Sequence, residues 1–192
     1  FDASGDLVPY PVGSACQGCG ICLKVCPFWR GNMDLPALNA QLFGAQGGHG
    51  TCYNPTAGHY TACYVGFSLI DRHRENGASG GLVTWSLEKL LQAGEVDRVA
   101  VVRRTSSEGR LFSFASCSDA RQIREAAGSR YYPVDVSELL RQIRQGPPLR
   151  WAVVGLPCLV HGVRLAMRAI PELGHRIRYL LALTCGMLPN SY

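Results

Sequence analysis

The sequence predicts an α/β domain with a parallel sheet, preceded by a small cysteine-rich module. Two observations lead to this fold class. In residues 76–192, short continuous apolar runs alternate with segments of helical periodicity, a pattern typical of parallel strands that helices cover on both faces. Residues 1–75 are instead rich in Gly, Pro, Asn and Cys, as in modules that metal ligation stabilises. We therefore divide the chain between residues 75 and 76.

The composition of the chain excludes several classes of protein. Hydrophobic residues make up 47% of the 192 residues, which is too many for a disordered chain. No apolar run approaches the roughly 18 residues of a membrane-spanning helix, so we expect no membrane span. The net charge of +5 comes from 17 Arg and 2 Lys without a basic stripe, and we expect no nucleic-acid partner. A solvated surface or the docking of an acidic partner explains the Arg surplus.

The first half of the α/β domain is expected to form one helix and two strands. Ser79 is a suitable N-cap, and Gly94 a suitable end, for a helix with apolar residues at helical spacing. These apolar residues are Leu82, Val83, Leu87, Leu90 and Leu91. Val96–Val102 predicts a strand, and Arg110–Ala115 predicts a second strand after a turn at residues 105–109.

The second half is expected to continue this alternation. Ser118 is expected to cap a short helix that ends at Ala127, and Ser137 to cap another that ends at Gln145. The elements expected after these are a strand at Trp151–Gly155, a helix at Leu159–Ala169 and a strand at Ile177–Leu183.

Four of the nine cysteines lie within eleven residues. Cys16, Cys19, Cys22 and Cys26 follow the pattern C-x2-C-x2-C-x3-C-P, the ferredoxin run that binds a cubane [4Fe–4S] cluster. Two-residue gaps let one loop place three thiolates around one face of the cube. Zinc is the alternative, although zinc sites more often pair two separate C-x2-C hairpins. Such clustering is typical of a reducing compartment, so we expect a cytoplasmic protein.

The fourth ligand of this cluster is open. Cys26 closes the cluster most simply, because the sequence has no second complete run. In two-cluster ferredoxins, however, the last cysteine of such a run serves the other cluster. Cys52 and Cys63 are then the alternative ligands, unless they are structural or free thiols.

A glycine-rich segment precedes the first helix of the α/β domain. Gly77, Gly80 and Gly81, together with the hydroxyls of Ser79 and Thr84, lie where backbone N–H groups and the helix dipole favour phosphate. A plain turn before a capped helix explains the same residues. Neither the dinucleotide fingerprint nor the P-loop pattern is present.

Two further segments carry candidate site residues. Cys158 and Cys185 each follow an apolar strand, so a parallel sheet would bring both to its carboxyl edge. They are either half of a metal site or two unrelated buried cysteines. In the segment Gly128–Tyr132, Arg130 would pair with a phosphate and a tyrosine would stack on a ring system, unless these are a surface Arg and core Tyr residues.

Five segments of the chain occur in the order found in one family. They are the ferredoxin run Cys16–Pro27, then Gly77–Val102, Ala126–Pro133, Val154–Arg164 and Leu183–Pro189. In these segments the chain resembles the coenzyme F420 hydrogenase/dehydrogenase beta-subunit family, which includes the F420-reducing hydrogenase beta subunit and 7-hydroxymethyl chlorophyll a reductase.

The resemblance implies an iron–sulfur flavoprotein that binds FAD in a flavin domain of the predicted α/β class. The flavin-binding residues it implies are Gly77, Ser79, Gly80, Gly81, Thr84, Gly128, Ser129, Arg130 and Tyr131. It also implies that Cys158 and Cys185 are two ligands of a second [4Fe–4S] cluster, whose other ligands the family takes from a later C-x2-C motif. The sequence ends at Tyr192 before such a motif, so we expect the C-terminal half of the family pattern to be absent.

The function expected on this basis is that of an FAD/iron–sulfur oxidoreductase. Electrons would pass between a ferredoxin-like donor, or a hydrogenase/dehydrogenase subunit, and a hydride-accepting small molecule such as coenzyme F420. The alternative is a non-catalytic, ferredoxin-like relay subunit that docks a separate catalytic partner. No catalytic acid or base is assigned, because the five His residues form no ligand spacing or triad, and His161 is expected on a helix surface.

Overall fold

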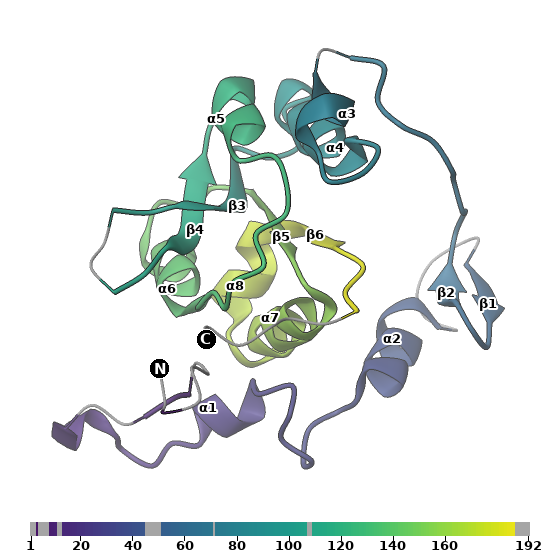
Figure 1. Ribbon diagram of the computed structural model, residues 1–192. Helices are drawn as coiled ribbons and strands as arrows, with labels where there is room; N and C mark the ends of the chain where they lie inside the picture. Colours follow the sequence, from purple (N-terminus) through teal and green to yellow (C-terminus); the bar gives the residue numbers. More distant parts are fainter. Residues whose placement is uncertain are drawn as a thin grey trace.

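The computed structural model describes residue 3 and residues 8–10, 13–44, 51–70, 72–106 and 109–186. Its centre is a four-stranded mixed sheet in the order β4-β3-β5-β6, with helices on both faces (Figure 1). The strands are β3 (Arg98–Arg104), β4 (Phe112–Cys117), β5 (Trp151–Gly155) and β6 (Ile177–Ala182). None of the described helices is long and apolar enough to cross a bilayer.

Three of the four strands run parallel, as the alternation of apolar runs and helices predicted. β5 pairs with β3 on one side and with β6 on the other, both in parallel. The prediction of a parallel sheet is wrong for β4, which pairs antiparallel with β3 and brings Phe114 opposite Val102. The cause is the short connection between β3 and β4, because a parallel crossover needs a dozen residues or more.

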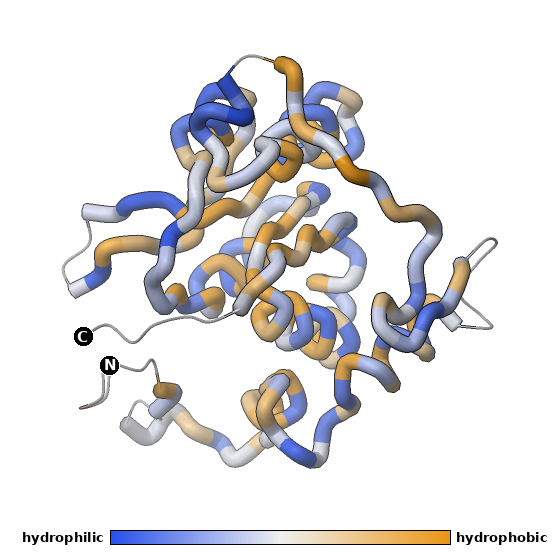
Figure 2. Tube along the Cα trace, turned by 45° about the vertical axis from the view of Figure 1, so that its right-hand side comes forward, coloured by the Kyte–Doolittle hydropathy of each residue, from blue (hydrophilic) through white to orange (hydrophobic). Residues whose placement is uncertain are grey.

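Each face of the sheet carries its own layer of helices and its own core. Val99, Val101, Ala152 and Val154 pack with Leu87 and Ile123 from α4 and α5. Alternate strand residues, Ala100, Trp151 and Val153, pack with Leu139, Val163 and Leu173 from α6, α7 and α8. The helices are α4 (Leu82–Gln92), α5 (Ala120–Glu125), α6 (Ser137–Gln145), α7 (Pro157–Ala169) and α8 (Pro171–Arg176). Figure 2 shows that apolar residues are concentrated in the strands at the centre of the α/β domain.

The helix starts differ from the predicted caps. Ser79 does not cap α4; Gly81 occupies the cap position with φ +72°, and no side chain caps the helix. Asp119, not Ser118, caps α5 by accepting a hydrogen bond from the Gln122 amide at 2.9 Å. At α6, Asp135 accepts from the amide and the hydroxyl of Ser137, which is the first residue of the helix.

The N-terminal module contains elements that the sequence analysis did not predict. They are the short helices η1 (Gly13–Ala15), α1 (Ile21–Lys24) and α3 (His73–Asn76), the helix α2 (Leu35–Phe43), and the hairpin of β1 (Cys52–Asn54) and β2 (Gly58–Tyr60). Asp34 caps α2 by accepting from the Ala37 amide at 2.8 Å. An extended segment, residues 61–70, leads from β2 to α3 and is called the strap below (Figure 1).

The module is seated on helix α7 rather than separated from the α/β domain. Val25, which follows α1, packs on the core between the sheet and α7, and Leu38 of α2 is completely buried. Residues 25–41 then follow α7 through contacts with His161, Gly162, Arg164 and Arg168. These contacts fix where the ferredoxin run lies relative to the sheet.

The start of the sheet carries an ion pair that makes stability depend on pH. Asp97, before β3, accepts hydrogen bonds from the backbone and guanidinium of Arg150, before β5, at 2.7–3.0 Å. These bonds lower the pKa of Asp97 to about 2. Because the pKa is lower in the folded state than in the unfolded state, the pair stabilises the fold above about pH 4 and loses this effect as pH falls towards 2.

We predict that Asp97→Asn lowers the urea midpoint of unfolding at pH 7 and that the difference from wild type shrinks as pH falls from 4 to 2. Urea titrations at several pH values measure it. The effect is expected to be small, because solvent screens a partly exposed pair. A difference that stays constant across this pH range would contradict the assignment.

Candidate functional site

The loop of the ferredoxin run presents its thiols outward. Cys16, Cys19 and Cys22 are exposed and Cys26 is half-buried. Gly18 and Gly20 have φ values of +65° and +70°, which only glycine adopts without strain, and they turn the backbone between the first three cysteines. Within the described residues, the amides of residues 18–23 donate no hydrogen bond to another residue. Such amides are the donors that cluster sulfur atoms accept from.

Asn32 closes this loop, and the sequence analysis did not identify it. Its Nδ2 group donates to the carbonyl oxygen of Leu23 at 2.6 Å and to that of Cys26 at 2.7 Å. Each of these oxygens also accepts from a backbone amide, that of Cys26 at 3.2 Å and that of Trp29 at 3.3 Å, so Asn32 adds to bonds already present in the turn. Asn32 therefore fixes the turn that carries the last cysteine of the run.

The described residues offer no site for a single metal ion. No three side chains of His, Cys, Asp or Glu come together closely enough to hold one in the described ranges. A cubane cluster has a different requirement, because each of its four irons takes one thiolate at a separate corner. Four thiols and the amides without partners fit that group chemically. Ligation by Cys16, Cys19, Cys22 and Cys26 stays a prediction.

The two later cysteines lie at the carboxyl edge of the parallel strands, as predicted. Gly155 and Ala182 are register partners at the ends of β5 and β6, and Cys158 and Cys185 are each the third residue after them. Both thiols are exposed, so they are not buried core residues. By contrast Cys117 is buried, and burial raises the pKa of its thiol, as expected of an unreactive structural cysteine.

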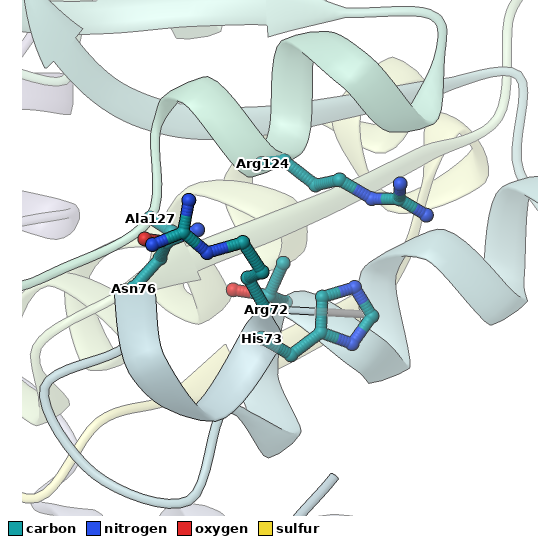
Figure 3. A pocket seen from close by; sticks show the side chains of 6 residues that line it. Arg72, His73, Asn76, Arg124 and Ala127 are labelled. Atoms are coloured by element: carbon teal, nitrogen blue, oxygen red, sulfur yellow. The ribbon is translucent and has the colours of Figure 1, made fainter. Parts of the chain in front are cut away.

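The two predicted flavin-binding segments come together in the fold, between α4 and α5. A Cβ atom on Gly128 would lie 3.4 Å from the carbonyl oxygen of Asn76, so the ends of the two segments are neighbours. A cavity of about 230 Å³ lies at this junction (Figure 3). It is lined by Arg72, His73, Asn76, Thr84, Arg124 and Ala127.

Thr84 is the predicted residue that lines the cavity itself. It lies in the first turn of α4 and is only 8% exposed. Its hydroxyl has no hydrogen-bond partner within the described part of the chain. The first backbone bond of α4 is donated by Trp85 to Gly81, so the preceding amides are also without helical partners. Thr84 and Asn76 therefore offer side-chain hydrogen-bond donors to the cavity.

The glycines before α4 serve close packing of the backbone. A Cβ on Gly80 would lie 2.9 Å from the carbonyl oxygen of Gly66 in the strap. A Cβ on Gly81 would lie 2.5 Å from the carbonyl oxygen of His73, and one on Gly77 2.8 Å from the same oxygen. Substitution at these positions would push the strap and α3 away from α4. The described structure thus gives Gly77, Gly80 and Gly81 a packing role, whatever they contact in a cofactor.

The remaining predicted residues lie on the outer side of the junction. Ser79 and Ser129 are exposed, and Tyr131 is 73% exposed. Arg130 donates to the carbonyl oxygens of Ser129 and Ala127 at 3.1 and 3.0 Å. Its guanidinium lies 5.9 Å from the ring centre of Phe112. Arg130 therefore stiffens the segment after α5, and Tyr131 presents a free aromatic face beside it.

A buried polar network forms one wall of the cavity, and no spacing in the sequence pointed to it. His73 Nδ1 lies 3.0 Å from the hydroxyl of Ser68, and His73 Nε2 lies 2.9 Å from a carboxylate oxygen of Glu88. Arg124 donates to both oxygens of Glu88 at 2.7 and 2.8 Å. His73 and Glu88 are each only 2% exposed. The network joins the strap, α3, α4 and α5.

The charge on Glu88 depends on these partners. Burial alone would raise the pKa of Glu88, but hydrogen bonds from Arg124 and His73 outweigh burial and hold the pKa below its ordinary value. The carboxylate is therefore ionised near neutral pH. Glu88 is buried, so losing Arg124 would leave its charge without full compensation, whereas the Arg124 side chain is 40% exposed to solvent.

We predict that Glu88→Gln lowers the free energy of unfolding by about 1–3 kcal/mol at pH 7, because it leaves the hydrogen bonds of His73 and Arg124 without their charged acceptor. Urea unfolding followed by circular dichroism measures this. Glu75→Gln is the matched control, since Glu75 pairs with Arg72 at the exposed surface, and we expect a change of less than about 0.5 kcal/mol. Equal effects of the two substitutions would contradict the network's importance.

Two family models, for the N-terminal and the C-terminal part of the coenzyme F420 hydrogenase/dehydrogenase beta subunit, match residues 63–141 and 149–191 respectively. The first match contains residues 63–70 of the strap, the polar network and the cavity. The second contains β5, β6, α7 and both sheet-edge cysteines.

Two curated relatives extend the similarity over most of the chain. An F(420)H(2) dehydrogenase subunit of Methanosarcina mazei is 26% identical over 184 residues, which cover 94% of this chain and 44% of the relative. Coenzyme F420-dependent sulfite reductase of Methanocaldococcus jannaschii is 28% identical over 195 residues, covering 88% of this chain and 30% of the relative. The chain thus spans less than half the length of either relative.

A solved structure has the same fold. The F420-reducing [NiFe] hydrogenase complex from Methanosarcina barkeri contains a chain that matches with a TM-score of 0.61 at 21% identity, covering 70% of this chain and 47% of that one. The two family models together match more than half of the residues. The chain belongs to the coenzyme F420 hydrogenase/dehydrogenase beta-subunit family.

Proposed function

We propose that the chain is the electron-transferring part of an FAD/iron–sulfur oxidoreductase that acts on coenzyme F420 or a related hydride-accepting molecule. The family is named for coenzyme F420 hydrogenase and dehydrogenase, and both relatives carry names of F420-linked oxidoreductases, which supports an electron-transfer role. The observation that supports the proposal most is the cavity at the junction of residues 76–84 and 124–128, in the same fold as a four-cysteine ferredoxin run.

The ferredoxin run would hold one [4Fe–4S] cluster through Cys16, Cys19, Cys22 and Cys26. Three exposed thiols, a half-buried fourth and amides that have no partner among the described residues suit that cluster. The exposed loop suits exchange of electrons with a ferredoxin-like protein or with a hydrogenase or dehydrogenase subunit. Cys158 and Cys185 would supply two ligands of a second cluster at the sheet edge.

The cavity would hold the phosphate-bearing part of FAD. Its donors are the Thr84 hydroxyl and the Asn76 side chain. Thr84 lies in the first turn of α4, and helix starts favour phosphate. Glu75 and Glu88 pair with Arg72 and Arg124, so recognition would depend on these donors more than on net positive charge. When bound, FAD supplies the ability to exchange a hydride with an organic molecule and single electrons with a cluster.

The size of the cavity limits what it would enclose. About 230 Å³ is below the roughly 300–1,000 Å³ of pockets that enclose a whole small molecule. The rest of the cofactor would extend outward past Gly128, where Tyr131 offers an exposed ring for stacking. This direction agrees with the roles that the resemblance gives to residues 128–131.

The relatives suggest the substrate and partners. One relative is named as an F(420)H(2) dehydrogenase subunit and the other as an F420-dependent reductase. On that basis we propose that this chain also uses coenzyme F420 and also assembles with other subunits. Reducing conditions suit exposed thiols that bind clusters, so we place the protein in the cytoplasm.

A relay subunit without flavin is the second candidate function. Two observations favour it. The ferredoxin run has four cysteines close together in the sequence, whereas the cavity is too small to enclose more than part of a flavin cofactor. The flavin content of the purified protein separates the two candidates.

We predict that Cys19→Ala abolishes the iron of the cluster bound by the ferredoxin run in anaerobically purified protein, because that cubane loses one of its four protein ligands. Iron and sulfide analysis with visible absorbance measures this. Cys52→Ala is the matched control, since Cys52 is exposed but outside the run, and it retains its iron if Cys26 is the fourth ligand. Zinc in wild type, with the same metal content in Cys19→Ala, would overturn the iron–sulfur proposal.

We predict that Thr84→Val weakens FAD binding about tenfold, because it removes a hydrogen bond to a charged group. Quenching of FAD fluorescence during titration measures the dissociation constant. Thr56→Val, at an exposed position of the β1–β2 hairpin, should leave binding unchanged. If wild-type protein neither retains nor binds FAD, the result would contradict the flavoprotein proposal and support the relay function.

A further inference from the structure

We propose that helix α7 positions the ferredoxin run relative to the sheet-edge thiols, and that His161 and Gly162 are the positioning residues. This proposal rests on the proposed function, because it concerns a cluster bound by the run. Neither residue is a cysteine or belongs to the loop. Their effect on the cluster would come through the backbone that they hold.

Hydrogen bonds of the neighbouring residues Asn32 and Met33 connect the ferredoxin run to α7. Asn32 holds the carbonyl oxygens of Leu23 and Cys26. The neighbouring residue, Met33, offers its carbonyl oxygen to His161 Nε2 at 2.9 Å. A carbonyl only accepts, so His161 carries its proton on Nε2 and donates it. His161 therefore fixes the segment that closes the loop around the fourth cysteine.

His161 is buried, contrary to the expectation that it lies on a helix surface. Only 6% of the residue is exposed, because the N-terminal module covers this side of α7. Removing its ring would leave the Met33 carbonyl without this partner in a partly buried setting, which is costly for a polar group. The bond links residues 128 positions apart in the sequence.

The ferredoxin run also approaches α7 closely at Gly162. A Cβ on this residue would lie 3.4 Å from Cδ of Pro27 and 3.5 Å from the carbonyl oxygen of Val25. The turn that ends the ferredoxin run thus rests directly on the helix backbone. A single methyl group would just fit, whereas a branched side chain would push the turn outward.

Cys158 lies on the same helix as Gly162. Residues four apart lie on one face of a helix, so Cys158 lies one turn before Gly162, on the face of α7 that Pro27 contacts. The thiol of Cys158 is exposed. The half-buried Cys26 and the exposed Cys158 therefore flank the same contact between the module and α7.

The far end of α7 strengthens the same seat. Arg164 donates to Asn39 at 2.8 Å and lies 5.2 Å from the ring centre of Phe43, and Arg168 donates to Gln41 at 2.7 Å. These acceptors are neutral, so salt screens the contacts less than it would screen ion pairs. The module therefore contacts α7 over more than one helical turn. These contacts let His161 and Gly162 hold the ferredoxin run in one position relative to α7.

The test uses the full chain with its cluster, prepared anaerobically. His161→Ala should speed release of iron to a chelator about tenfold and shift the EPR spectrum and midpoint potential of the reduced cluster. His161→Gln keeps an N–H donor and should restore most of the wild-type behaviour. His175→Ala is the matched control, because His175 is exposed on α8, and it should behave as wild type.

Gly162 gives an independent arm of the test. Gly162→Val should shift the same spectrum and potential while circular dichroism shows the fold intact, and Gly162→Ala should shift them much less. If wild type binds the cluster, but His161→Ala and Gly162→Val leave iron release, spectrum and potential unchanged, the positioning proposal is overturned alone. If wild type binds no iron, the proposed function falls first and this proposal falls with it.

Discussion

Strand β5 is buried at every one of its five residues, and the arrangement of the rest of the molecule depends on that burial. β5 has a neighbouring strand on each side and helices over both faces, so the chain that follows it can leave only at the carboxyl edge of the sheet. The chain must then return over one face as a helix. α7 is that returning helix, so its first turn is fixed at the carboxyl edge and its outer side is left for the N-terminal module.

The opposite face of the sheet carries a second segment by a different kind of contact. There the strap and α3 approach α4 backbone to backbone, at glycines that leave no room for a side chain. The buried His73–Glu88–Arg124 network completes this contact with charged hydrogen bonds. Burying such groups stabilises a fold only when each finds its partner. The two predicted flavin-binding segments meet because this network closes the space between α4 and α5.

The sequence was informative wherever local pattern decides the structure. Trp151–Gly155 is a strand at the predicted residues, and the helix after it differs only in starting two residues earlier, at Pro157. The cap positions were wrong where two candidates compete, as Ser118 does with Asp119. α2 was missed because it lies in a segment rich in Gly, Pro and Asn, although Asp34 before Leu35 and Pro36 is a helix-start signal.

Long-range contacts of the site could not be predicted from spacing. Glu88 and Arg124 are 36 residues apart, and the partner of His161 is a backbone carbonyl, which leaves no mark in the sequence. Periodicity identified the elements that would meet at the sheet edge, namely the segments carrying Cys158 and Cys185. It did not identify Asn32, whose role depends on the turn it closes.

The order of synthesis adds a consequence of the seat on α7. Met33 leaves the ribosome 128 residues before His161, its partner. At about 5–20 residues per second, this leaves an interval on the order of ten seconds. Throughout that interval the nascent ferredoxin run has neither its helix nor its neighbouring sheet to rest on. Loading of iron and sulfide before α7 emerges would therefore act on a loop held only by its own short-range hydrogen bonds, including those of Asn32. Loading afterwards would act on a loop that α7 also holds.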